Sequence, residues 1–269
     1  MTSPRKKYPL APGEEEALMA NSTLSQAMLL VGGVVAAMVV SGLLTGEWFT
    51  AVVGFGWADA IADSILAMNA GLTVGIGLAL ALAFLVLGAV VEWVALRFES
   101  GKESVLEARR GLNGELIRLS WPNIVLLMCM TGCAEELLFR FGLYGVIKIG
   151  FAMVAPAWYA SLFALVISSV VFWMAHVRYR DLWSTILVLV MAFALGIAFA
   201  VTGSIAVVVI AHVVYDTVDI AIERHRLSRD DDYFQGPAPD RILLDMLDEQ
   251  LAESENPADD EDEGSGGEK

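Results

Sequence analysis

The sequence predicts an all-α fold: a polytopic integral membrane helix bundle of about six spanning helices, followed by a disordered acidic C-terminal tail. Of the 269 residues, 57% are hydrophobic and only 18% are charged. The mean hydropathy is +0.62, and apolar runs of about 20 residues recur along the chain. These observations argue against a soluble fold. No basic stripe of the kind that binds nucleic acid is present, so membrane lipids rather than nucleic acid are the expected surroundings.

Six apolar segments are each close to the roughly 20 residues that an α-helix needs to cross a bilayer. They form the predicted transmembrane bundle, residues 26–223, of which 121–223 is the candidate catalytic core. The six segments are 26–44, 71–96, 121–146, 155–177, 182–202 and 204–223.

The basic residues predict how the bundle is oriented. Most Lys and Arg residues lie before the first span and after the second, fourth and sixth spans, within Arg5–Lys7, Arg97–Arg118, Arg178–Arg180 and Arg224–Arg229. The segments on the other side of the membrane contain only Lys148. Cytoplasmic loops are enriched in Lys and Arg, so we expect both chain termini to be cytoplasmic, in a protein of the cell (inner) membrane.

Three further segments lie outside these spans. Residues 1–25 are expected to form a cytoplasmic arm. Residues 45–70 combine aromatic side chains with aspartates and glycines, which favours an interfacial segment on the outer side. Residues 97–119 have apolar side chains at helical spacing between charges, and either a helix lying on the membrane or a short soluble helix against the bundle fits this pattern.

The C-terminal segment, residues 224–269, is a predicted cytoplasmic tail that is mostly disordered. From residue 230 onward it has fifteen Asp and Glu residues against Arg241 and Lys269. The stretch Arg241–Leu251 has leucines at the spacing of one amphipathic helix, and the end is an acidic low-complexity run. A solvated tail and a docking segment are both compatible with this composition.

The stretch Thr131–Arg140 (TGCAEELLFR) interrupts the third apolar run with charged residues. An ionised group within a membrane helix costs at least about 2.5–3.5 kcal/mol, so such residues indicate a functional site. Glu136 and Arg140 are four residues apart and share a helix face, where they can pair. Glu135 points about 100° away and needs another partner.

Two later spans supply candidate partners. Phe172 and His176 share a face of the fourth span, and His212 and Asp216 share a face of the sixth. Each pair has a structural alternative, because buried ion pairs and helix–helix hydrogen bonds use the same residue types. The motifs E-E-x-x-x-R, F-x-x-x-H and H-x-x-x-D, in this order on three spans, are harder to attribute to packing alone.

This set of motifs resembles the CAAX-protease and bacteriocin-processing family of intramembrane glutamic endopeptidases, which includes the Ras-converting prenyl-protein proteases. The resemblance covers residues 121–223. It implies that Glu135 and His176 activate a water molecule, that His212 and Asp216 line the oxyanion site, and that Glu136 and Arg140 support them. The family more often has Asn where this chain has Asp216, and an aspartate must either be protonated to donate or act by orienting His212.

The predicted function is therefore an endopeptidase that hydrolyses a peptide bond of a membrane-associated or lipidated peptide or protein, without a cofactor. Prenylated CAAX proteins, bacteriocin or pheromone precursors and C-terminal sorting signals are all compatible substrates. A zinc protease is an alternative, although no H-E-x-x-H helix is present. A non-proteolytic scaffold or immunity protein with the same fold is another. The sequence gives no indication of the oligomeric state.

One geometric condition accompanies this prediction. Glu135 lies about 20 Å along its helix from Trp121, whereas His176 is expected near the cytoplasmic end of its span. The two side chains can meet only if the helix is tilted or its first turns lie at the interface.

Overall fold

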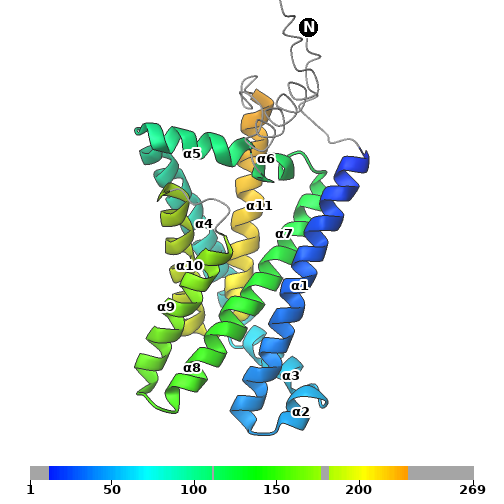
Figure 1. The fold of residues 1–269 in the computed structure, drawn as a ribbon, viewed down its shortest axis with the longest axis vertical. Helices are drawn as coiled ribbons and strands as arrows, with labels where there is room; N and C mark the ends of the chain where they lie inside the picture. The colour runs from blue at the N-terminus through cyan, green and yellow to red at the C-terminus, as the bar shows by residue number, and fades with distance from the viewer. Residues whose placement is uncertain (1–11, 111, 177–181, 230–269) are drawn as a thin grey trace, which may run out of the picture.

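The computed structural model describes residues 12–110, 112–176 and 182–229, and the regular structure in these ranges is helical throughout. Figure 1 shows the arrangement of the helices. Their bounds are α1 Pro12–Thr45, α2 Trp48–Val52, α3 Gly56–Ile65, α4 Ala70–Ala95, α5 Glu99–Arg110, α6 Leu112–Leu116, α7 Trp121–Glu136, η1 Leu137–Leu143, α8 Tyr144–Ala152, α9 Ala157–Ala175, α10 Leu182–Thr202 and α11 Ile205–Arg229.

Five of the described helices, α1, α4, α9, α10 and α11, are long and apolar enough to cross a membrane. Their outward faces carry large apolar side chains such as Leu82 and Val86, whose exposed fractions are 62% and 57%. A surface with this many exposed apolar side chains is unfavourable in water but suits lipid. The chain is therefore an integral membrane protein, and the predicted all-helical membrane bundle is confirmed.

The remaining predicted span, residues 121–146, consists of three helical segments that follow one another directly. α7 ends at Glu136, η1 is a π-helix, and α8 continues to Ala152. π-Helical turns are rare and are often found at functional sites. This one begins directly after the two adjacent glutamates.

α1 begins at Pro12, so residues 12–25 of the predicted cytoplasmic arm are helical and continuous with the spanning helix. α1 runs parallel to the α7–η1–α8 series, and glycines allow the two to approach closely. A Cβ atom on Gly33 would lie 3.0 Å from Leu137 Cγ, and one on Gly142 would lie 2.5 Å from Ala36 Cβ. Small residues at such contacts are typical of packed membrane helices.

α11 lies at the centre of the bundle and contacts both α4 and α7. On the α4 side, a Cβ atom on Gly77 would lie 2.7 Å from Ile210. On the α7 side, one on Gly132 would lie 2.6 Å from Val213. Gly132 is one turn before Glu136, so this close approach brings the middle of α11 against the end of α7.

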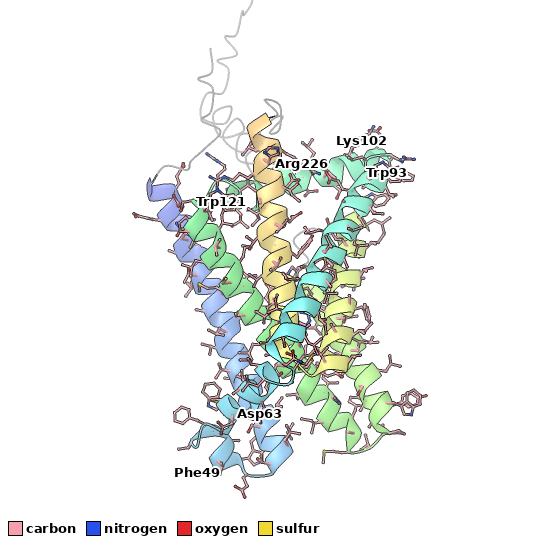
Figure 2. All side chains as sticks on the ribbon, turned by 180° about the vertical axis from the view of Figure 1, so that it is seen from behind. Phe49, Asp63, Trp93, Lys102, Trp121 and Arg226 are labelled. Carbon is pink, nitrogen blue, oxygen red and sulfur yellow. The ribbon has the colours of Figure 1, made fainter. Side chains whose placement is uncertain are left out.

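The two ends of the bundle differ in structure. α5 and α6 lie across the end at which α11 finishes, and α2 and α3 are at the opposite end (Figure 1). Figure 2 shows Trp93, Lys102, Trp121 and Arg226 at the first end, far from Phe49 and Asp63. Residues that the sequence assigned to opposite membrane sides are thus separated along the bundle.

At the α2–α3 end, Ser64 connects α3 to the beginning of α11. Its hydroxyl donates to the carbonyl of Gly203 at 2.7 Å and accepts from the backbone N–H of Ile205 at 3.1 Å. Gly203 has a φ of +66°, a conformation that glycine adopts without strain. This turn fixes the start of α11, two turns before His212.

Residues 224–229 of the predicted tail belong to α11. The amphipathic helix predicted for Arg241–Leu251 and the rest of the tail, from residue 230 onward, lie outside the described residues, as do Arg178 and Arg180.

Candidate active site

The structure brings all six predicted site residues into one cluster in the bundle. α7 supplies Glu135 and Glu136 in its last turn, η1 supplies Arg140, His176 follows the end of α9, and α11 supplies His212 and Asp216. Helices from three parts of the chain thus contribute ionisable side chains to one place, as the polar faces of a membrane bundle are expected to do.

Glu136 is the fully buried centre of this cluster, with an exposed fraction of 0%. Its Oε1 atom lies 2.7 Å from His212 Nδ1, and its Oε2 atom lies 3.2 Å from Arg140 Nε. One carboxylate therefore bridges a histidine on α11 and an arginine on the π-helix. The predicted pair of Glu136 and Arg140 is present, and the contact with His212 adds to it.

Arg140 is buried on the π-helix between this carboxylate and an aromatic ring. Its guanidinium carbon lies 4.0 Å from the centroid of Phe172, on α9. Phe172 in turn packs edge-on against Phe139, with their centroids 5.1 Å apart. A desolvated cation over an aromatic face is stabilised by about 2 kcal/mol, so Phe172 helps to hold Arg140 where it supports Glu136.

Glu135 faces both histidines. Its Oε2 atom lies 3.5 Å from His176 Nε2 and 3.9 Å from His212 Nε2, and the residue is 7% exposed. The depth condition is met in two ways: α7 runs obliquely through the bundle, and the short helix α9 ends well before the level of α5 (Figure 1). His176, which directly follows α9, is therefore within reach of Glu135.

The hydrogen bonds of the two histidines define which ring nitrogen faces Glu135. His176 Nδ1 lies 2.8 Å from the carbonyl oxygen of Phe172, and a carbonyl can only accept, so Nδ1 carries a proton. His212 Nδ1 is engaged by Glu136. Each ring therefore presents Nε2 to the same oxygen of Glu135, an arrangement in which protons can move between a carboxylate and imidazoles.

Asp216 lies on the other side of His212. Its Oδ2 atom is 3.3 Å from His212 Nε2, and its side chain is 23% exposed, more than any other carboxylate of the cluster. His212 Nε2 is therefore placed between Asp216 and Glu135. Both predicted roles of Asp216, a protonated donor and an orienting group for His212, are compatible with this position.

The contact between Glu136 and His212 is the part of the site that the sequence analysis missed. Helical spacing identifies neighbours within one helix, such as Glu136 and Arg140, but it does not show which helices meet. The sequence held one indication of this contact. A buried histidine needs hydrogen-bond partners for its ring nitrogens, and the apolar spans contain few acceptors other than Glu135 and Glu136.

A metal site was the other chemical possibility for these residue types. Within residues 12–110, 112–176 and 182–229, no three His, Cys, Asp or Glu side chains are grouped so that they could hold a metal ion.

Residues 117–218 match the model of a family described as type II CAAX prenyl endopeptidase Rce1-like. The matched range contains all six clustered residues and nearly coincides with the stretch on which the resemblance was based. The resemblance is therefore confirmed. Searches of curated proteins and of solved structures found no match.

Proposed function

We propose a reaction for this chain on the premise that residues 117–218 are a domain of the Rce1-like CAAX prenyl endopeptidase family, a family of peptidases. The chain hydrolyses a peptide bond of a membrane-associated or lipidated peptide, using a water molecule activated by Glu135 and His176. The observation that carries this proposal is the buried Glu135 carboxylate, whose Oε2 atom lies within 4 Å of Nε2 of both histidines.

Glu135 is the general base of the proposed reaction. It takes a proton from water while the water oxygen forms a bond to the scissile carbonyl carbon, and His176 Nε2 orients that water molecule. The same proton then passes from Glu135 to the leaving nitrogen as the carbon–nitrogen bond breaks. A positioned acid–base group of this kind typically contributes about 10²–10⁴-fold to the rate.

His212 and Asp216 stabilise the negative oxygen of the tetrahedral intermediate. Glu136 holds His212 Nδ1 at 2.7 Å, which fixes the orientation of the ring and directs Nε2 toward the substrate. A proton on Nε2, or one on Asp216, supplies the donor. Such donors are effective in a buried site because their dipoles are already oriented and water does not screen them.

The proposed substrate carries a lipid group near the scissile bond. The family description names CAAX prenyl substrates, and the apolar outer faces of the bundle suit a lipid chain that remains in the bilayer. A polar cluster between spanning helices can then receive the peptide. Prenylated CAAX peptides are thus the first substrates to test, followed by other lipidated or membrane-bound precursors.

The test uses the full chain in lipid nanodiscs with a farnesylated fluorogenic peptide that ends in a CAAX sequence. We expect the wild type to cleave this peptide faster than its unlipidated form, and Glu135→Gln to leave both intact. Equal cleavage by Glu135→Gln would rule out the proposed base. Loss of cleavage on chelation, with recovery on adding zinc, would favour the zinc protease instead.

A cellular comparison covers substrates other than CAAX peptides. Membrane peptides from cells that express wild type, Glu135→Gln or His176→Ala would be compared with those from a deletion strain by mass spectrometry. Cleavage products that depend on both residues support the endopeptidase. A wild-type effect that both variants retain would point to a non-proteolytic scaffold.

A further inference from the structure

Glu15, in the first turn of α1, reaches the beginning of α7. Its Oε1 atom accepts a hydrogen bond from the backbone N–H of Ser120 at 2.9 Å and another from Asn123 Nδ2 at 2.8 Å. Ser120 is the residue directly before α7, and its own side chain does not cap the helix. A glutamate from another helix therefore satisfies a backbone donor that the beginning of α7 would otherwise leave unpaired.

The same segment is held from the opposite side by α11. Arg224 Nη1 donates to the carbonyl oxygen of Leu119 at 2.8 Å, and the guanidinium carbon lies 5.0 Å from the centroid of the Trp121 ring. Beneath these contacts is an apolar core of Ile117, Leu119, Ile124, Leu127, Met128, Ile220 and Leu227. The beginning of α7 is thus fixed to the two helices that flank it.

These contacts define the axial position of α1 against α7 and η1. The helices run parallel, and their partners keep the same spacing along both: Glu15 meets Ser120, Gly33 meets Leu138, and Val40 meets Gly145. A Cβ atom on Gly33 would lie only 3.1 Å from the backbone nitrogen of Leu138. Gly33 thus packs directly against the first turn of η1, beside Glu136, and a displacement of α1 along α7 would be transmitted to that turn.

We propose that Glu15 and Arg224 are positioning residues for the active site. They hold the beginning of α7 to α1 and α11, and so keep Glu135 and Glu136 at the depth of His212 on α11. Neither residue touches the reacting groups. This inference rests on the proposed endopeptidase function, because its effect is expressed as the rate of that reaction.

The activity test compares substitutions of two glutamates in the same turn of α1. We expect Glu15→Ala to lower kcat for the farnesylated peptide about 10-fold with little change in KM, because a small displacement of catalytic groups costs rate rather than binding. Glu15→Gln keeps an oxygen that accepts both hydrogen bonds and should restore most of the rate. Glu16→Ala, at an exposed neighbouring position, is the matched control and should behave as wild type.

A distance measurement tests the same inference without activity. Spin labels at Leu44 on α1 and Leu126 on α7, both more than half exposed, are introduced after Cys129 and Cys133 have been replaced by alanine. The labels lie far apart along the bundle, so their separation reports sliding of one helix past the other. We expect Glu15→Ala to shift it by about 1.5 Å or more, the rise of one residue, and Glu15→Gln and Glu16→Ala to leave it unchanged.

The outcomes separate this inference from the proposed function. A lower kcat together with a shifted distance, both reversed in Glu15→Gln, supports the positioning role. Wild-type kcat in Glu15→Ala overturns it, whether or not the distance shifts, as long as Glu135→Gln is inactive. If Glu135→Gln is as active as wild type, the proposed function fails, and an unchanged distance would then also overturn the axial role of Glu15.

Discussion

α11 carries two clusters of ionisable residues that differ in burial and in their basic residues, which are histidines in one cluster and an arginine in the other. The first is the candidate active site around His212. The second lies toward the end that bears α5 and α6, where Arg226 Nη1 lies 2.7 Å from Glu92 Oε1 and 2.6 Å from Glu223 Oε1. Both clusters join α11 to a neighbouring helix through carboxylates, so residue type alone does not separate a chemical role from a structural one.

The difference lies in which protons can move. In the second cluster the cation is an arginine, which keeps its charge at all relevant pH values, and the side chains of its partners Glu92 and Glu223 are 26% and 21% exposed. In the first cluster two imidazoles face a carboxylate that is almost fully buried. A partly exposed network built on an arginine favours structure, whereas imidazoles and a carboxylate that face one another away from water favour proton transfer.

The largest expected effect is on catalysis by the first cluster. Glu135→Gln should reduce cleavage of the farnesylated peptide by about 10²–10⁴-fold, because the amide cannot accept the proton from water. The matched change in the second cluster, Glu92→Gln, should leave the rate within about 2-fold of wild type, because a partly exposed pair has little effect on the site. The initial rate in nanodiscs measures both. Comparable losses in the two variants would break the comparison.

The next largest effect is on stability. Glu136→Ala leaves Arg140 buried without its carboxylate, and removing one member of a buried ion pair typically costs about 3–5 kcal/mol. Glu223→Ala, in the partly exposed cluster, should cost no more than about 1 kcal/mol. Thermal unfolding in detergent, followed by circular dichroism, ranks the two. The comparison would need revision if Glu223→Ala were the more destabilising change.

A smaller effect sharpens the role of Asp216. Its Oδ2 atom lies 3.3 Å from His212 Nε2, and an asparagine amide at this position can donate a hydrogen bond. If Asp216 acts as a donor, Asp216→Asn should keep the initial rate within about 10-fold of wild type, whereas Asp216→Ala should lower it by about 10²-fold. Equal losses in the two variants would instead assign Asp216 to orienting His212.

The smallest expected effect is that of Arg226. Replacing it with alanine should change the free energy of unfolding by about 1 kcal/mol or less, because its side chain is 39% exposed and water compensates much of the lost attraction. The kcat value should remain that of wild type. A large loss of kcat with intact folding would show that the second cluster belongs to the active site after all.

The features that follow from helical periodicity and hydropathy could be predicted from the sequence. The apolar spans indicated the bundle, and the spacing of four residues predicted that Glu136 meets Arg140 and that His212 meets Asp216. The structure has these pairs at 3.2 and 3.3 Å. Within one helix, the number of residues between two positions determines how far apart their side chains are, so such contacts can be predicted without the tertiary structure.

Contacts between helices, and the π-helix itself, could not be predicted in the same way. The bond from Glu136 to His212 joins residues 76 positions apart, and that from Glu15 to Ser120 joins residues 105 apart. Both depend on how helices tilt and where they begin. η1 has the apolar composition of the α-helix that precedes it, and a wider turn leaves no mark in composition. The polar faces of the later spans offered His176 and His212 as candidate partners of Glu135, and the resemblance to a known family selected His176.

The parallel packing of α1 against α7, η1 and α8 has a consequence for synthesis. A helical hairpin can form as soon as its second helix is made, but parallel neighbours need an antiparallel segment between them, here supplied by α4. All of α1 is therefore synthesised before any residue of α7. Its face with Gly33 lacks its partner helices until α7 and η1 have been made. The packing of α7, which carries Glu135 and Glu136, against α1 is thus a late step in the folding of the chain.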